Sequence, residues 1–171
     1  ATKAGAEELC VAYTNTYKLP IIITHTMNVF GERQHPEKFI PKIISSLIYN
    51  KKLTIHADKS KRKAGSRFYI HVDDVSDAVL FLLSKGKINQ KYNIVGSKEI
   101  NNLELAKIIA KHLNKKLNFR MVDFHSTRPG HDLRYALSGE KLKKMGWQPK
   151  KNIKHRIQQT VDWTLNNKNW L

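Results

Sequence analysis

The chain has 171 residues, which is long enough for one domain, or a large part of one, with a buried hydrophobic core. Its composition, 40% hydrophobic and 26% charged, is that of a globular protein and excludes an extensively disordered chain. The formal charge of +17 leaves nucleic acid, an anionic membrane surface and a small anionic substrate open as partners. The basic residues are scattered, without the interleaved aromatic side chains of base-stacking proteins, so we expect no specific nucleic-acid partner.

The single cysteine and the shortness of the apolar runs bear on where the protein works. Cys10 has no intramolecular disulfide partner, and its place on an apolar helix face predicts a buried thiol in a reducing compartment, the cytoplasm. No apolar run has the length of a membrane span and no signal-peptide pattern opens the sequence, so we expect no membrane association. The chain begins at Ala1 without an initiating Met or a helix cap, and we interpret it as a piece of a longer protein.

Helical and strand patterns alternate through the first half of the chain. Residues 1–18 predict a helix, because apolar side chains recur there at helical spacing. A short apolar run at 21–23 is typical of a buried parallel strand. The further predictions, in chain order, are an irregular polar segment at 24–36, a helix at 39–50, a strand at 53–55, a charged loop at 56–66 and a strand at 68–72.

The same alternation continues in the second half. Asp73 or Asp74 is expected to cap a helix at 75–84, which Gly86 would end. Asn102 is expected to cap a further helix. The other predictions are a strand at 92–96, a strand at 117–122, and helices at 139–145 and 153–166. Helices and strands that alternate in this way predict an α/β fold.

The densest group of functional side chains lies at residues 128–135, Arg-Pro-Gly-His-Asp-Leu-Arg-Tyr. Two guanidiniums, an imidazole and a phenol surround a Pro-Gly pair, which favours a tight turn. The planar donor fork of Arg matches phosphate oxygens in a way that Lys does not. By themselves these residues fit either a phosphate-binding loop or a solvated basic loop between a strand and a helix.

Four segments, in their order and spacing, resemble one enzyme family. They are Ala-Thr-Lys-Ala at 1–4, Asn-Val-Phe-Gly at 28–31 with Pro-Glu-Lys-Phe-Ile-Pro at 36–41, Arg67 to Asp74, and 128–135, supported by 92–96, Trp163 and Trp170. With them the chain resembles the C-terminal half of an extended short-chain dehydrogenase/reductase that acts on nucleotide sugars, in the NAD-dependent epimerase/dehydratase family. Within that family it is most similar to the NDP-glucose 4,6-dehydratases, the dTDP-glucose 4,6-dehydratase type.

The resemblance implies the last parallel strands and helices of a Rossmann-like core together with a small substrate-binding domain. Residues 1–35 would end the core and include the active-site lysine helix, and residues 36–171 would be mainly the nucleotide-sugar domain, with core elements interleaved. None of the eight glycines forms the Gly-rich phosphate loop of a dinucleotide site, so the N-terminal NAD motif is expected to be missing. The chain alone is therefore expected to be inactive and not to bind NAD.

Lys3 matches the lysine of the family's Tyr-x-x-x-Lys pair, whose members lie one helical turn apart and face one site. The resemblance makes Lys3 both catalytic and cofactor-binding: it would activate the tyrosine and hold the nicotinamide ribose. Counting back places that tyrosine just before Ala1. Without the resemblance, Lys3 would be a surface lysine.

The resemblance also assigns residues to the substrate. Asn28, Lys38 and Arg67 would contact the diphosphate, and Arg128 would clamp the diphosphate or the ribose edge. The other assigned positions are Glu37 at a helix start, Phe39 in the nucleotide pocket or equally in the core, His56 near the base, His131 beside the nucleotide or sugar, and Tyr135 behind them.

One loop and two single positions depart from the subgroup's pattern. The loop at 57–66 is longer than usual, which leaves the nucleotide base open. Phe68 stands where an acidic residue commonly follows the arginine, and Leu133 stands where a second arginine is frequent.

The implied activity is a cytoplasmic lyase reaction with bound NAD and no metal. Hydride leaves sugar carbon 4 for NAD, water is eliminated across carbons 5 and 6, and the hydride returns to carbon 6, so NAD is not consumed. The implied partners are a nucleoside-diphosphate sugar and a second copy of the chain, bound through the Lys3 helix. An NDP-sugar 4-epimerase or a UDP-glucuronate decarboxylase remains the alternative within the superfamily. From another class, a basic nucleic-acid-binding module rests on the net charge alone.

Overall fold

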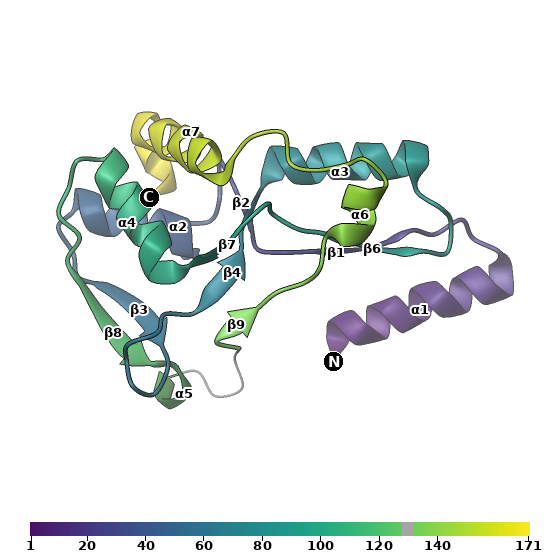
Figure 1. Ribbon diagram of the computed structural model, residues 1–171, viewed down its shortest axis with the longest axis horizontal. Helices are drawn as coiled ribbons and strands as arrows, with labels where there is room; N and C mark the ends of the chain where they lie inside the picture. Colours follow the sequence, from purple (N-terminus) through teal and green to yellow (C-terminus); the bar gives the residue numbers. More distant parts are fainter. Residues whose placement is uncertain (128–131) are drawn as a thin grey trace.

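The computed structural model describes residues 1–127 and 132–171, along which helices and strands alternate as the sequence predicts (Figure 1). The helices are α1 (Thr2–Tyr17), α2 (Phe39–Ile48), α3 (Val72–Lys85), α4 (Asn102–His112), α5 (Phe124–Thr127), α6 (Glu140–Lys144) and α7 (Ile153–Asn166), followed by the 3₁₀ turn η1 (Lys168–Trp170). The strands are β1 (Ile23–Thr26), β2 (Val29–Phe30), β3 (Leu53–Ala57), β4 (Ser66–Phe68), β5 (Ile70–His71), β6 (Lys91–Ile94), β7 (Glu99–Asn101), β8 (Phe119–Asp123) and β9 (Arg134–Tyr135). The fold is therefore α/β.

Within the described residues the strands form four small sheets, three of which are parallel pairs. β1 pairs with β6, β2 with β5, and β3 with β8. In the fourth sheet β4 lies in the middle, antiparallel to β7 and parallel to β9. The two strands of a parallel pair run in the same direction, so their carboxyl ends lie at one edge.

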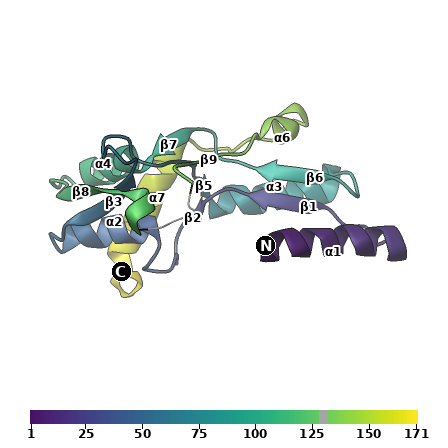
Figure 2. The same cartoon turned by 90° about the horizontal axis from the view of Figure 1, so that it is seen from below.

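The elements gather into two regions. Around the β1–β6 pair, α3 and α1 lie on opposite sides in Figure 1. At the other end of the molecule α2, α4 and α7 gather beside the β3–β8 pair, and β4 and β9 lie between the two ends (Figures 1 and 2).

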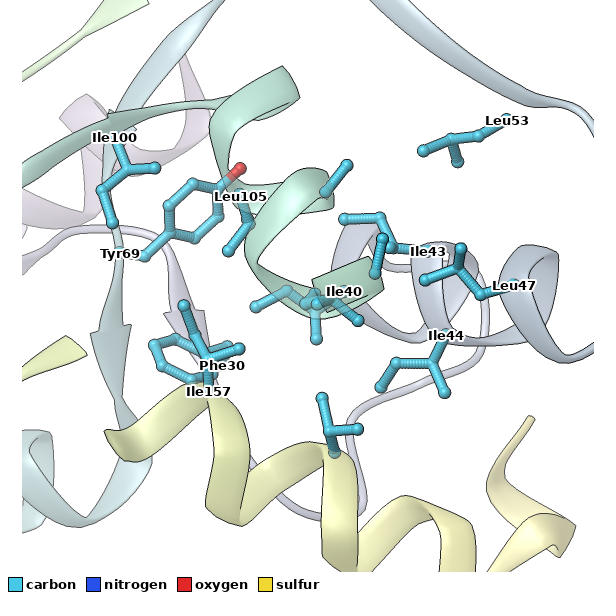
Figure 3. Packing of buried hydrophobic residues seen from close by; sticks show 14 of the residues in the cluster. Phe30, Ile40, Ile43, Ile44, Leu47, Leu53, Tyr69, Ile100, Leu105 and Ile157 are labelled. Carbon is cyan, nitrogen blue, oxygen red and sulfur yellow. The ribbon is translucent and has the colours of Figure 1, made fainter. Parts of the chain in front are cut away.

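The larger hydrophobic core belongs to the region of α2, α4 and α7. Amphipathic patterning produces it: β3 alternates buried and half-buried residues, and α2 buries a stripe at helical spacing. Figure 3 shows this stripe converging with side chains from α4, α7 and the central strands. The labelled residues are Phe30, Ile40, Ile43, Ile44, Leu47, Leu53, Tyr69, Ile100, Leu105 and Ile157.

The smaller core lies between α3, α6 and the β1–β6 pair. Its buried residues are Ile70, Ala78, Leu82, Tyr92, Ile94, Leu142 and Trp147. α1 adds little to it, because Thr14 is the helix's one buried residue. Leu9 and Tyr17, which the sequence places on an apolar stripe, are 62% and 65% exposed. The expected burial of Cys10 is also wrong, because its side chain is only half-buried.

Several predicted boundaries shift for local reasons. The run at 21–23 was expected to be the strand, but β1 begins only at Ile23 and continues into polar residues. The predicted strand at 68–72 divides at Tyr69 into β4 and β5, because its two halves pair with different partners. β2, which lies in the segment 24–36 expected to be irregular, β7 and β9 were not predicted, since each is too short to show a period.

The N-caps of α3 and α4 each lie at least one residue before the position that the sequence predicts. α3 begins at Val72, and the imidazole of His71 accepts the hydrogen bond from the Asp73 backbone N–H at 3.2 Å. Neither Asp73 nor Asp74 caps the helix; both lie in its first turn. α4 is capped by Asn101, whose side chain accepts from the Glu104 N–H at 2.8 Å. Gly86 is the C-cap of α3, as predicted.

Candidate functional site

The carboxyl ends of β1 and β6 mark one edge of the candidate site, because ligands of parallel α/β sheets bind outside those ends. Asn28 follows β1 and is exposed, and its backbone carbonyl accepts from the Ile70 N–H at 3.1 Å. Lys3 is exposed in the first turn of α1. In both views the N-terminal end of α1 is the end nearer to β2 and β9 (Figures 1 and 2). The structure therefore places Lys3 and Asn28 toward the same middle part of the molecule.

A second group of polar side chains surrounds Gly65. A Cβ at this glycine would lie 3.0 Å from the Leu133 carbonyl oxygen, 3.7 Å from Asn102 Nδ2 and 3.8 Å from Arg67 Nη1. Gly65 therefore lets β4, the start of α4 and the residues before β9 approach closely. The hydroxyl of Tyr69 donates to Asn102 Oδ1 at 2.7 Å, which leaves the amide nitrogen as the donor of Asn102 on the side of Arg67.

Arg67 holds the chain that follows residues 128–131. Its Nη1 donates to the Leu133 carbonyl at 2.9 Å and its Nη2 to the Asp132 carbonyl at 2.7 Å. The guanidinium carbon also lies 6.0 Å from the centroid of the Tyr135 ring, at the limit of a cation–π contact. The structure thus brings Arg67 and Tyr135 together, with part of the arginine's fork engaged by backbone carbonyls. Arg128 and His131 lie outside the described residues.

Arg134 points away from this group. Adjacent residues of a strand face opposite sides of the sheet, so Arg134 and Tyr135 lie on different faces. Arg134 instead binds Glu99 through Nε and Nη2, each at 2.9 Å from a carboxylate oxygen. These bonds, followed by one from the Ser66 hydroxyl, lower the pKa of Glu99 below its ordinary value. Arg134 therefore joins β9 to β7 across the face of the β4–β7–β9 sheet that does not carry Arg67 and Tyr135.

A third group lies at the carboxyl ends of the parallel β3–β8 pair. His56 of β3 lies edge-on to Phe124 of α5, with the ring centroids 6.1 Å apart, and Phe124 lies edge-on to His125 at 5.5 Å. α5 follows β8 directly and leads into residues 128–131. These aromatic rings supply the apolar and stacking surfaces that a planar base needs.

The start of α2 supplies the remaining predicted residues. Lys38 is the N-cap, and Glu37 and Lys38 are exposed. Phe39 is half-buried and packs against the larger core, which agrees with the core alternative for this residue. α2 thus presents Glu37 and Lys38 to solvent and anchors them through Phe39.

Sequence reasoning missed Asn102 as a member of the site, because it assigned that side chain to the helix cap. The signal was the pair Asn101-Asn102: the first asparagine caps α4, so the amide of the second is available to Tyr69 and to the space around Gly65. Phe124 and His125 were missed as well. His56 was predicted to open a loop, but it lies in β3, whose parallel partner β8 leads directly into Phe124 and His125.

A cavity of about 350 Å³ lies elsewhere and is lined by none of the predicted site residues. Phe68, Val95 and Trp147 are among its walls. Phe68 neighbours Arg67 in β4 and so faces the opposite side of the strand. We place the candidate site on the Arg67 side, where the polar groups converge.

Comparisons with known proteins agree with this arrangement. The NAD dependent epimerase/dehydratase family model matches residues 1–95. Over 99% of its length the chain is 40% identical to the trifunctional UDP-glucose 4,6-dehydratase/UDP-4-keto-6-deoxy-D-glucose 3,5-epimerase/UDP-4-keto-L-rhamnose-reductase of Arabidopsis thaliana, of which it covers 25%. It is 38% identical to the dTDP-D-glucose 4,6-dehydratase of Homo sapiens, again over 99% of its length, and covers 49% of that protein.

A solved structure shares the fold. The dTDP-glucose 4,6-dehydratase of Bacillus anthracis, in complex with NAD, matches 98% of the chain with a TM-score of 0.86 and 35% sequence identity, and the chain covers 52% of that structure. The chain spans about half the length of the curated dTDP-glucose dehydratases that it matches. Among residues 1–127 and 132–171, no helix combines the length and the apolarity that crossing a membrane requires.

Proposed function

Because the chain belongs to the NAD dependent epimerase/dehydratase family, we propose that the protein is a nucleotide-sugar 4,6-dehydratase that uses NAD as its hydride carrier. The observation that carries this proposal is the 38–40% identity to 4,6-dehydratases over 99% of the chain. The convergence of Arg67, Asn102 and Tyr135 around Gly65 and β9 supports it, since a nucleoside diphosphate needs several donors in one place. We also propose that the protein is located in the cytoplasm.

The residues present fit one end of NAD. Lys3 is exposed at the end of α1 that lies nearer to β2 and β9, where it would hold the nicotinamide ribose and orient the family's tyrosine one helical turn before it. The glycines of this sequence form no dinucleotide phosphate loop, so we assign none of these residues to the adenosine end. When bound, NAD accepts hydride from sugar carbon 4 and returns it to carbon 6.

The substrate's diphosphate is proposed to lie between the groups of Asn28 and Gly65. Asn28, Lys38 and the Asn102 amide would donate to its oxygens, together with Arg128 and a guanidinium nitrogen of Arg67. These donors grip a part of the substrate that does not react, and this binding positions the sugar against the nicotinamide. Residues 1–35 and 36–171 would then divide the work into a cofactor side and a mainly substrate-binding side.

The nucleoside is proposed to lie at the third group. His56 and Phe124 would face the base or the ribose, and Tyr135 of β9 would lie behind them. His131 keeps its proposed role beside the nucleotide or sugar. The rings of His56 and Phe124 already lie edge-on to each other, with their centroids 6.1 Å apart, without a ligand. The longer loop after His56 is the feature that we expect to influence the choice of base.

We further propose a homodimer through α1. Leu9, Tyr13 and Tyr17 are 62%, 51% and 65% exposed, and a second copy would cover them. Leu9→Glu combined with Tyr17→Glu should dissociate the full-length protein into monomers in sedimentation analysis. An unchanged sedimentation coefficient would place the interface elsewhere.

The activity is tested with the full-length protein, NAD and either UDP-glucose or dTDP-glucose. The expected product has lost one water and carries a ketone at carbon 4, which mass spectrometry and carbonyl labelling detect. The preferred nucleotide identifies the base. A product of unchanged mass with inverted carbon 4 would replace the proposal by the 4-epimerase reaction, and loss of carbon dioxide from UDP-glucuronate would replace it by the decarboxylase reaction.

A further inference from the structure

A buried histidine closes a polar ring that joins three separate parts of the chain. The side chain of His71 is fully buried, and its Nδ1 accepts from the Asp73 N–H at 3.2 Å. Asp73 accepts from Arg156 Nη1 at 2.8 Å, and the same nitrogen donates to Gln159 Oε1 at 3.2 Å. Gln159 Nε2 donates to Glu32 Oε1 at 2.9 Å, and Glu32 Oε2 lies 3.2 Å from His71 Nε2. The ring therefore connects the segment after β2, the start of α3 and helix α7.

The links of this ring are unequal. Arg156 also binds Asp74 through two nitrogens, at 2.8 and 3.1 Å, and both side chains are nearly buried. The contact between His71 Nε2 and Glu32 lacks the alignment of a good hydrogen bond. The bond from Gln159 is consequently the well-aligned link between α7 and Glu32.

The segment after β2 needs such a link. Arg33 has a φ of 61°, in the left-handed region that non-glycine residues rarely adopt. Gly31 packs so closely on α3 that a Cβ there would lie 2.6 Å from Val72 Cγ1. The guanidinium of Arg33 lies 5.4 Å from the ring centroid of Trp163 in α7. A strained conformation persists only where the surroundings impose it, and here α7 and the start of α3 supply those surroundings.

This segment connects two of the proposed substrate ligands. Asn28 precedes it and Lys38 ends it, as the N-cap of α2. We propose that Gln159, Glu32 and His71 are positioning residues: through the ring they hold residues 31–38 in the conformation that places Lys38, relative to Asn28, at the diphosphate. The substrate half of this inference rests on the proposed function, whereas the control of the segment's conformation by α7 does not.

The chain offers a clean test of the link. Gln159→Ala removes the bond to Glu32 and leaves Arg156 with both of its carboxylate partners, so the core ion pair stays intact. Gln158→Ala makes the same change at the adjacent, exposed position and is the matched control. Glu32→Ala removes the other partner of the same bond.

The first measurement is hydrogen exchange of the backbone amides of residues 31–38 in the full-length protein. We expect Gln159→Ala and Glu32→Ala each to accelerate exchange about tenfold or more, and the double variant to add little, because both remove one interaction. Gln158→Ala should match the wild type. Unchanged exchange in Gln159→Ala, or effects of the two single variants that add in full, would overturn the inference.

The second measurement separates positioning from general stability. Gln159→Ala should raise the KM for the nucleotide sugar several-fold with a smaller change in kcat, and thermal unfolding should stay close to that of Gln158→Ala. Faster exchange with an unchanged KM would overturn the substrate half of the inference. A wild-type protein that binds no nucleotide sugar would defeat the proposed function instead, and the exchange measurement would still decide whether α7 holds the segment.

Discussion

The two regions of the molecule treat their apolar residues in opposite ways. Around α2, α4 and α7 the apolar stripes face one another, and Ile44, Leu105 and Ile157 are fully buried. Around the β1–β6 pair the helices keep large apolar side chains at the surface, with Leu83 of α3 76% exposed and Tyr17 of α1 65% exposed.

The region of α2, α4 and α7 forms a hydrophobic core from its own side chains, whereas α1 and α3 present apolar side chains as contact surfaces. The first region buries its apolar area within the described chain, so its stability should depend on those side chains. Exposed apolar side chains contribute little to folding, and where several gather they mark interaction surfaces. An apolar stripe at helical spacing can therefore mark either a buried core face or an exposed contact surface, and mutation distinguishes the two.

The largest effect is expected at the ion pair that joins the two regions. Arg156 of α7 binds Asp74 of α3, and their side chains are only 8% and 4% exposed. Arg156→Ala leaves the Asp74 carboxylate buried without its cation, and it should lower the free energy of unfolding by about 3–5 kcal/mol. Urea denaturation measures this change.

The matched control is the pair of the exposed Lys150 with the half-buried Asp77, also an α3 carboxylate. Lys150→Ala should cost less than about 1 kcal/mol, because solvent screens the exposed lysine. If the two variants were equally stable, the junction between the regions would be unimportant for folding.

The second effect measures the contrast between the regions directly. Ile44→Ala removes a fully buried side chain from the larger core and should cost about 2–5 kcal/mol of unfolding free energy. Leu83→Ala removes an exposed side chain of α3, and its cost should stay within about 0.5 kcal/mol. Each substitution is made singly, and the change in its urea unfolding midpoint is measured. Equal costs would mean that Leu83 is covered in solution.

A third, smaller effect concerns the boundary where Arg67 holds the chain before β9. Arg67→Lys keeps the charge but cannot donate to the Asp132 and Leu133 carbonyls through a planar fork, so nucleotide-sugar binding should weaken by about 1.5–3 kcal/mol. Arg134→Lys, on the opposite face of the neighbouring strand, is the control and should leave binding unchanged. Calorimetric titration and the content of bound NAD are the measurements. A loss of NAD with normal sugar-nucleotide binding would show that Arg67 serves the cofactor.

The sequence predicted the elements whose local signals agree with their packing. The limits of α7 were predicted at 153–166, where an apolar stripe follows Asn152, whose side chain accepts from the His155 N–H. The α/β class and the family followed from such elements and from the ordered motifs, and both are confirmed. The roles of the individual site residues stay predictions.

The remainder depends on tertiary contacts that a single sequence does not contain. β9 has two residues and exists because Arg67 and Tyr135 meet in register. The stripe of α1 gives the pattern of a buried face, yet Leu9 is exposed, because periodicity states which side of a helix is apolar and not what covers it. The ring around His71 joins residues up to 127 positions apart and has no local signature.

The smallest expected effect is a pH dependence at the junction of the regions. Burial lowers the pKa of His71 below its ordinary value of 6.5, and Arg156 acts in the same direction, while Glu32, Asp73 and Asp74 raise it by less. The imidazole is therefore neutral in the fold at pH values where the unfolded chain already binds a proton. The unfolded state binds more protons, so stability rises with pH. The contribution of His71 is present above pH 6.5 and is lost as the pH falls from 6.5 toward the lowered pKa.

His71→Asn isolates this contribution, because asparagine is a good N-cap for the Asp73 N–H and does not titrate. Its packing cost against Phe30 does not vary with pH, so it only offsets the two stability curves. The measurement is the free energy of unfolding of both proteins in urea, between about pH 7.5 and pH 5. The advantage of the wild type should shrink steadily over the acid half of that range. A difference that stays constant would mean that the folded protein protonates His71 as readily as the unfolded chain, and that the surrounding carboxylates, chiefly Glu32, outweigh its burial.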